Sequence, residues 1–307
     1  MSEASPATGA AGAARAGGSG GALGAGRGWT PSPRQRERDA YRRRRTTRSA
    51  LVALVSTALV GGLLVTTVVS SPGWPRVQAS FFDLAVARES LPSVLEGLWL
   101  NLRVWAAAGV LMLVLGLVLA VLRTLRGPVF WPVRALATVY VDLFRGLPVI
   151  IVLLLVGFGV PGLRLQGTPS DVGVLGAIAL TLTYSAYVAE VFRAGIESVH
   201  PSQRAAARSL GLSAGQTMRS VVLPQAVRRV VPPLLNDLVS LQKDAGLISV
   251  LGALDAIRYA GIETATTASF TPYVVAGACF IALTIPLTRF TDWVARRYGY
   301  VPAGGHL

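Results

Sequence analysis

Six long apolar blocks constrain this chain more than any other feature of its sequence. The blocks lie at about 51–70, 98–122, 136–160, 173–194, 229–252 and 271–291. Each is close to the roughly twenty residues that a helix needs to cross about 30 Å of hydrocarbon. They are too long and too uniformly apolar for barrel strands, and backbone groups in lipid must bond within their own segment. The sequence therefore predicts an all-α integral membrane protein with about six transmembrane helices.

The composition fits this class and argues against a soluble enzyme. Charged residues make up 14% of the chain, whereas a soluble domain has roughly a quarter. The single cysteine, Cys279, and the two histidines, His200 and His306, have no partners at metal-ligand spacing. We expect no metal, no cofactor and no catalytic residue.

The basic residues between the blocks predict the orientation. With the N-terminus inside, the four cytoplasmic segments carry 19 Lys and Arg residues and the three outside segments carry 4. The positive-inside rule then places both termini in the cytoplasm of a multi-pass protein in the plasma (inner) membrane.

The N-terminal region divides into a tail and an extra helix. Residues 1–48 are Gly/Ala-rich and then Arg-rich, and we expect a disordered cytoplasmic tail. Residues 49–71 are expected to form an N-terminal transmembrane helix that is retained, because no clear cleavage site follows them. The arginine run most simply orients this helix and contacts anionic membrane lipid. Nucleic-acid binding is the alternative interpretation, but we expect no nucleic-acid partner.

One cytoplasmic segment, 190–233, is longer and more ordered than a simple connection. Ser202 is expected to cap a short helix that Gly211 ends, and Ser213 a second helix that Pro224 limits. Such an elbow would fit a socket on a partner. The alternative is an amphipathic hairpin that lies on the lipid surface.

The spacing within this elbow resembles the EAA loop of ABC importer permeases. The matching residues are Ala205, Ala206, Ala207, Gly211, Val221, Leu223 and Pro224. The resemblance implies a coupling-helix loop that docks on an ATP-binding subunit, with Arg204, Arg208 and Gln203 as further contacts. The family usually has Glu where this chain has Ala205, and that Glu would complete a capping box with Ser202.

Four further stretches are similar to the polar amino acid permeases of the histidine/glutamine/glutamate type. They are YVDLFRGLPVI, AEVFRAGIESV, QTMRSVVLPQA and LVSLQKDAGLISVLG. The resemblance covers residues 90–295, which we expect to form the permease domain. Residues 296–307 would then be a cytoplasmic C-terminal tail.

Polar residues at membrane depth are costly and therefore mark function. The candidates for the substrate pathway are Arg145, Glu190, Asn236, Lys243 and Asp244. Gly146 and Pro148 can interrupt the helix beside Arg145, and the resemblance implies that this stretch lines the pathway; a snorkelling arginine is the alternative. Lys243 and Asp244 are expected to pair with Arg145 or Glu190. They would either bind an amino acid or hold helices together.

The resemblance implies the membrane-spanning permease subunit of an ATP-binding-cassette importer for polar amino acids, with glutamate or a relative as candidate substrate. The partners would be ATP-binding cassette subunits, an extracellular or periplasmic amino-acid-binding protein, and a second permease subunit, like or unlike this one. ATP hydrolysis is expected in the partner, because the only lysine, Lys243, lies in an apolar block and no P-loop motif exists. The alternative is an ion-coupled secondary transporter or channel without an ATPase.

Overall fold

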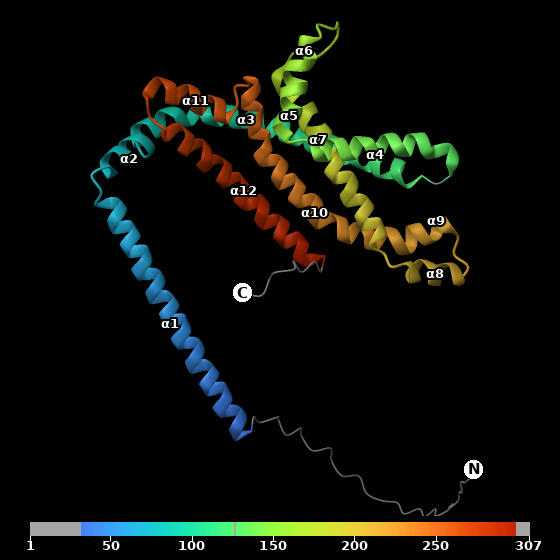
Figure 1. Ribbon diagram of the computed structural model, residues 1–307, viewed down its shortest axis with the longest axis horizontal. Coiled ribbons are helices and arrows are strands. Elements are labelled where there is room, and N and C mark those ends of the chain that lie inside the picture. Colours follow the sequence, from blue (N-terminus) through green and yellow to red (C-terminus); the bar gives the residue numbers. More distant parts are fainter. Residues whose placement is uncertain (1–31, 126, 299–307) are drawn as a thin grey trace, which may run out of the picture. The chain divides into compact units, whose positions relative to one another are not determined.

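The computed structural model describes residues 32–125 and 127–298, and these residues form helices and turns without a strand. The chain divides into two units, residues 1–71 and 72–307, which are described separately. The N-terminal unit holds a single helix, and the second unit holds a bundle of helices (Figure 1).

Helix α1 (Pro33–Val69) is the only element of the first unit within the described residues. Ser32 caps it, and Pro33 occupies its first position, where proline is tolerated. No Gly or Pro follows until Gly61, so the helix runs unbroken through the arginines into the apolar block. The predicted disorder is therefore wrong for residues 33–48; residues 1–31 lie outside the described part.

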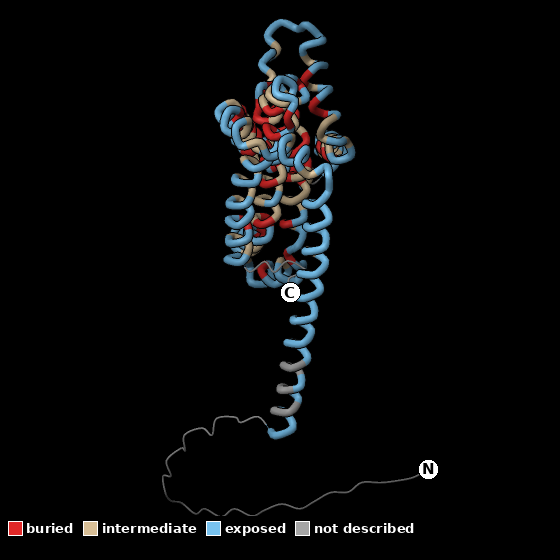
Figure 2. The backbone as a smooth tube through the Cα atoms, turned by 90° about the vertical axis from the view of Figure 1, so that its left-hand side faces the viewer, coloured by how far each residue is buried: buried red, intermediate tan, exposed pale blue. Residues whose placement is uncertain are grey.

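No residue of the apolar part of α1, 45–69, is buried within the protein (Figure 2). This stretch is long and apolar enough to cross a membrane by itself. Its exposed leucines and valines fit contact with lipid.

Within the described residues, the second unit contains eleven α-helices and four short turns of other helical types. The α-helices are α2 (Trp74–Phe81), α3 (Leu84–Thr124), α4 (Trp131–Gly146), α5 (Val149–Leu154), α6 (Val160–Gly162), α7 (Val172–Glu197), α8 (Pro201–Ser209), α9 (Ala214–Thr217), α10 (Leu223–Asp244), α11 (Ala256–Thr267) and α12 (Thr271–Arg297). The other turns are η1 (Pro128–Phe130), η2 (Leu155–Gly159), η3 (Met218–Val222) and η4 (Ala245–Leu251).

The prediction of about six membrane helices is confirmed, but two of the six are bent. Four helical stretches can span alone, namely 45–69, 74–124, α7 and α12. The other two candidates are pairs, 128–146 with 149–162, bent by 108°, and 214–251 with 256–267, bent by 51°. The block at 136–160 is interrupted where Gly146 and Pro148 were expected to interrupt it. Helix α4 ends at Gly146 and α5 begins after Pro148, as a proline following an extended residue requires.

Helices also occupy two of the segments between the apolar blocks. Helix α2 and the first fourteen residues of α3 lie before the apolar block at residue 98, and α11 lies between the last two blocks. Asp83 caps α3 and Asp255 caps α11 with side-chain hydrogen bonds of 2.8 Å to backbone N–H groups. These helices are too short or too polar to be found from apolar runs.

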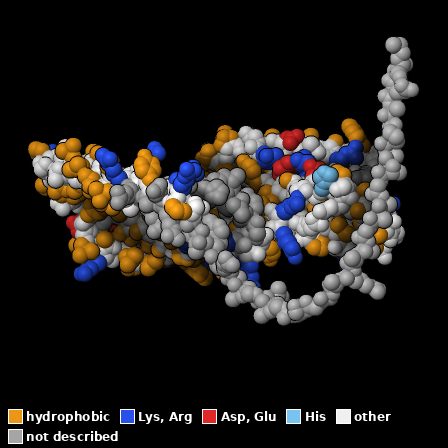
Figure 3. Space-filling model, turned by 90° about the horizontal axis from the view of Figure 1, so that it is seen from below, with side chains coloured by type: hydrophobic (Ala, Val, Ile, Leu, Met, Phe, Trp, Pro, Cys, Tyr) orange, Lys and Arg blue, Asp and Glu red, His pale blue; other side chains and the backbone are white. Residues whose placement is uncertain are grey.

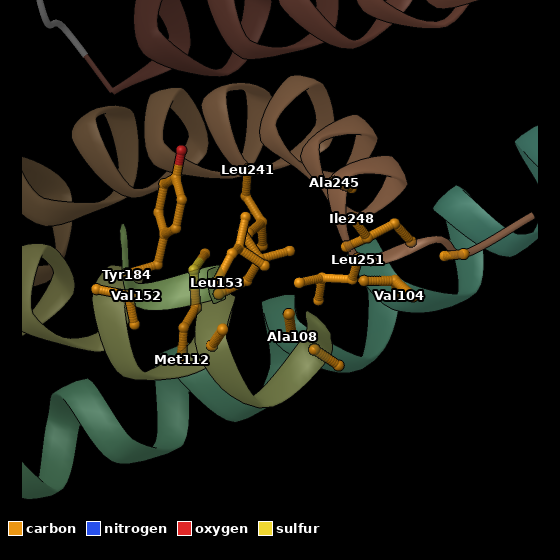
Figure 4. Packing of buried hydrophobic residues seen from close by; sticks show 14 of the residues in the cluster. Val104, Ala108, Met112, Val152, Leu153, Tyr184, Leu241, Ala245, Ile248 and Leu251 are labelled. Carbon is orange, nitrogen blue, oxygen red and sulfur yellow. The ribbon is translucent and has the colours of Figure 1, made fainter. Parts of the chain in front are cut away.

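The core of the second unit lies between α3, α5, α7 and the end of α10 (Figure 4). Met112, Leu153, Leu180 and Leu241 are fully buried there. Glycine permits the closest approach of α3 to α7, since a Cβ on Gly116 would lie 2.4 Å from a Val188 methyl carbon. Small residues at such contacts are typical of packed membrane helices.

A second contact joins α3 to the break between η4 and α11. The Asn101 Nδ2 group donates to the Ala245 carbonyl (2.9 Å) and to Asp255 Oδ2 (3.0 Å). Its Oδ1 accepts from the Ala256 N–H (3.1 Å). One turn earlier, a Cβ on Gly97 would lie 2.3 Å from the Asp255 carbonyl carbon. Gly97 and Asn101 thus share the face of α3 that holds the break.

Gly97→Ala should destabilise the solubilised permease, because the new methyl group would collide with backbone rather than with a movable side chain. The expected loss is about 1–3 kcal/mol, as for overpacked cores. Gly277→Ala is the matched control, since Gly277 also lies in a long helix, α12, and has nothing within 4 Å of the added carbon. Thermal unfolding in detergent measures both variants. Equal melting temperatures would contradict this account of the break.

Candidate functional site

Helices α8 and α9 form the predicted elbow, at the opposite end of the second unit from α11 (Figure 1). The cap of α8 differs from the prediction. His200 is the N-cap, and its Nδ1 accepts from the Ser202 N–H at 3.2 Å, while Ser202 lies inside the first turn. A Glu at position 205 would therefore not complete a capping box with Ser202, because the cap lies two residues earlier than predicted.

Gly211 forms the turn between the two helices, as predicted. Its φ of +83° lies in the left-handed region that favours glycine. The Leu212 N–H donates to the Ala207 carbonyl (3.2 Å) and the Gly211 N–H to the Arg208 carbonyl (3.0 Å). These two bonds make a Schellman motif, which satisfies carbonyls at the end of α8.

Helix α9 begins with a complete capping box. The Gln216 N–H donates to Ser213 Oγ (3.2 Å), and the Ser213 N–H donates to Gln216 Oε1 (2.8 Å). The predicted end at Pro224 is wrong. The helix widens into the π-turn η3 and continues as α10, in which Pro224 lies in the first turn and leaves no unpaired N–H.

The elbow exposes small side chains and one large apolar one. Ala205, Ala206 and Arg208 are exposed, whereas Ala207 is buried against the elbow itself. Leu210 is 83% exposed at the turn. The sequence reasoning did not single out Leu210, although a leucine just before a turn glycine in a polar segment is a usable signal. Figure 3 shows basic side chains gathered on this end of the second unit.

Arg204 does not face outward as expected. Its guanidinium donates to the Ile196 carbonyl at the end of α7. Arg229 on α10 donates to the neighbouring Ser198 carbonyl. A Cβ on Gly195 would lie 3.1 Å from a methyl carbon of Val230, so the two helices also touch directly. Arg204 thus joins α8 to the end of α7, and the other two contacts join α7 to α10. Arg208 remains as the outward arginine of α8.

The remaining elbow residues of the predicted set lie where η3 passes into α10. Val221 is half-buried, and Leu223 and Pro224 are exposed. Their neighbour Val222 is the buried residue of this turn, at 1% exposure. The predicted elbow residues therefore divide into those that hold the elbow together and those that are open to a partner.

Glu190, on α7, is the centre of a cluster of arginines that come from α3, α4 and α7. Its carboxylate lies 3.0 Å from Arg123 Nη1 and 3.9 Å from Arg145 Nη1, and it also pairs with Arg193. Arg193 bonds Glu197 as well. Three guanidinium groups thus surround one central carboxylate. Arg145 is the least engaged, because its side chain is 42% exposed and its ion pair is the longest.

The second polar group lies around Tyr184, which points from the core toward α10 (Figure 4). The Tyr184 hydroxyl donates to Asp244 Oδ2 at 2.8 Å. Asp237 lies seven residues before Asp244, two turns earlier on the same face of α10. Its Oδ2 is buried and has no hydrogen-bond partner among the described residues.

A continuous strip of side chains along α7 connects the two groups. From Asp244, the strip passes through Tyr184 to Tyr187, and the ring centroids of these two tyrosines are 6.1 Å apart. The Arg145 guanidinium carbon then lies 5.9 Å from the Tyr187 centroid, and Arg145 reaches Glu190. The strip is acidic at one end and basic at the other.

The expected pairing of Lys243 or Asp244 with Arg145 or Glu190 is wrong. Arg145 and Glu190 pair with each other, and Asp244 accepts from Tyr184. Lys243 and Asn236 are exposed and form no ion pair or side-chain hydrogen bond within the described residues. Neighbours on a helix point about 100° apart, so Lys243 and Asp244 cannot face the same site. Sequence reasoning missed Arg123 and Tyr184, because one follows an apolar block and the other is a common core residue.

Comparison with known proteins identifies the family of the chain. The family described as "binding-protein-dependent transport system inner membrane component" matches residues 112–300. The arginine transport system permease protein ArtQ of Bacillus subtilis is 33% identical over 216 residues, covering 70% of this chain and 96% of ArtQ. The probable glutamine ABC transporter permease protein GlnM of the same organism is 37% identical over 187 residues, covering 60% and 83%.

Two solved structures share the fold. An amino acid ABC transporter crystallised with histidines has a TM-score of 0.65 at 31% identity, covering 70% of this chain and 98% of that one. The MetNI methionine ABC transporter, in inward-facing conformations, has a TM-score of 0.56 at 20% identity, covering 67% and 96%.

Proposed function

The chain belongs to the family of binding-protein-dependent transport system inner membrane components. We propose that its α8–α9 elbow couples ATP hydrolysis in a separate subunit to transport through this one. The chain is a permease subunit of an amino-acid ABC importer. We propose as its partners two ATP-binding subunits, a substrate-binding protein outside the membrane, and a second permease chain, like or unlike this one.

The observation that carries the coupling proposal is the exposed turn between α8 and α9. An almost fully exposed Leu210, beside the exposed Ala205 and Ala206, leaves apolar surface open to water. Such a surface fits a socket on a partner. Because Arg204 joins α8 to the end of α7, and α9 continues through η3 into α10, a push on the elbow would reach the helices that carry Glu190 and Asp244.

We propose that the elbow faces the cytoplasm, with both ends of the chain on the same side. The excess of basic residues in the segments on that side supports this orientation.

The orientation can be tested with single cysteines in a Cys279→Ser background. Gln203→Cys in α8 should react with an impermeant thiol reagent only in inverted vesicles, and Gln166→Cys only in intact cells. Both residues are exposed, and Gln166 is preferred to the neighbouring Gly167, whose φ of +82° would strain a cysteine. Labelling of Gln166→Cys from the cytoplasmic side would reverse the proposed topology.

Gly211→Val tests the elbow. A β-branched residue in the left-handed region is strained by roughly 1–2 kcal/mol, so the Schellman turn should open and α8 should shift. The permease should still insert, because the turn lies outside the membrane helices. Co-purification of the ATPase and its stimulation by loaded binding protein should both be lost.

Gly127→Val is the matched control, since Gly127 also has positive φ (+105°) and open space but lies outside the elbow. It should retain the ATPase. Full stimulation of ATP hydrolysis in Gly211→Val would remove the elbow as the coupling element.

We further propose that the strip from Asp244 to Glu190 lines the substrate pathway. Asp237 and Asp244 have no cationic partner among the described residues, and unpaired carboxylates at membrane depth are costly. A substrate ammonium or guanidinium group would supply the missing charge. Arg145, the loosely paired arginine at the other end, would donate hydrogen bonds to the α-carboxylate of the substrate. This favours a cationic amino acid over glutamate.

Replacing both carboxylates, Asp237→Asn/Asp244→Asn, should raise the apparent KM for arginine uptake by roughly tenfold to a hundredfold, the worth of a hydrogen bond to a charged group. Uptake into proteoliposomes of the complete importer measures it. Asp292→Asn, an exposed site in α12, is the control and should leave KM unchanged. If the double variant transports arginine normally, or if glutamate is the better substrate of the unaltered importer, the acidic end does not select the substrate.

A further inference from the structure

A basic, aromatic pocket lies between α10 and the end of α12, away from both groups described above. It has a volume of about 580 Å³ and is lined by Arg228, Trp293, Val294, Arg297 and Tyr298. The Arg297 guanidinium carbon lies 5.5 Å from the Trp293 ring centroid. A guanidinium over an indole face is held in place while its N–H groups stay free to donate.

The described residues do not balance the charge of this pocket. No acidic residue lines it. Neither Arg228 nor Arg297 forms an ion pair within the described part of the chain, whereas Arg123, Arg145 and Arg193 all reach Glu190. Two unpaired arginines on different helices, facing one pocket, fit the oxygens of a phosphate group.

The neighbouring side chains indicate the depth of the pocket. Phe290, Trp293 and Tyr298 are each about half exposed near the end of α12, and the Phe290 and Trp293 rings are stacked with centroids 6.1 Å apart. Exposed aromatic residues at the end of an apolar helix are typical of the membrane–water interface. A basic pocket between membrane helices at this level suits an anionic headgroup, and the apolar walls suit the start of its acyl chains.

We propose that this pocket binds the phosphate of an anionic phospholipid of the cytoplasmic leaflet, such as phosphatidylglycerol. The leaflet rests on the orientation proposed above. Arg228 lies on α10 only four residues after Pro224, so an occupied site would tie the base of the elbow to α12. The lipid would thereby fix the two helices against each other at the end where the elbow is attached.

The test uses the assembled permease–ATPase complex in detergent, titrated with phosphatidylglycerol and followed by native mass spectrometry. The Arg228→Gln/Arg297→Gln double variant should lose affinity for the bound lipid by roughly 30-fold, because each basic residue near an anionic membrane surface contributes about fivefold. Arg289→Gln/Arg296→Gln is the matched control, with the same change in charge on exposed residues of α12 outside the pocket. It should bind the lipid as the unaltered complex does.

Three results would overturn the proposal. Equal losses in both double variants would indicate general attraction to a basic surface, and no loss in either would exclude the pocket. Displacement of the lipid by excess inorganic phosphate would identify a site for a soluble anion instead. Because lipid binding is measured without transport, a failure here is distinct from a failure of the elbow or of the proposed substrate.

Discussion

The architecture of the second unit depends on how one asparagine closes a break in a membrane helix. Where α10 gives way to η4 and then to α11, backbone groups lose their helical partners in a region with little water. Asn101 supplies both a donor and an acceptor to that break, and it also bonds Asp255, the cap of α11. Gly97 lets α3 come close enough for these bonds to form. Non-helical backbone at this depth is tolerated only when it is buried in protein in this way.

Two of the polar residues lie at helix ends. Arg145 belongs to the last turn before the bend at Leu147 and Pro148, and Asp244 is the last residue of α10 before η4. The first bend thus follows Arg145 directly, whereas the second bend comes after Leu251, one η4 turn beyond Asp244. Helix α7 runs straight between them and presents Tyr184, Tyr187 and Glu190 in sequence. The strip along α7 therefore forms where the ends of α4 and α10 pack against one continuous helix.

Apolar blocks and turn residues were sufficient to predict the spans and the elbow from the sequence. The lengths of the blocks predict a membrane protein. Gly211 predicts the turn and Ser213 the cap of the second helix, because turns and caps depend on residues that are close together in the chain. The caps of α3 and α11 are equally local, but their helices lack the apolar runs that signal a span. His200 replaced Ser202 as a cap because the chain enters α8 one residue before Pro201, and histidine Nδ1 can accept as a serine oxygen does.

The pairing of charges could not be predicted, because it depends on which helices meet. From the sequence, Lys243 and Asp244 are neighbours and Arg145 and Glu190 are distant. In the folded chain the distant pair meets, and the neighbours diverge by the angle between successive helical residues. That divergence bears on the substrate pathway proposed above, along the strip from Asp244 to Glu190. With Lys243 turned away, no basic side chain of the described residues pairs with Asp237 or Asp244, so the α10 end of the strip is acidic. Tyr187 separates that end from Arg145, and the α-ammonium and α-carboxylate of one amino acid are attached to the same carbon. A single zwitterionic centre therefore cannot engage both ends, whereas a long side chain with a terminal cation can extend along the tyrosines from one to the other. Glutamate would bring a second carboxylate to the acidic end, where it would be repelled.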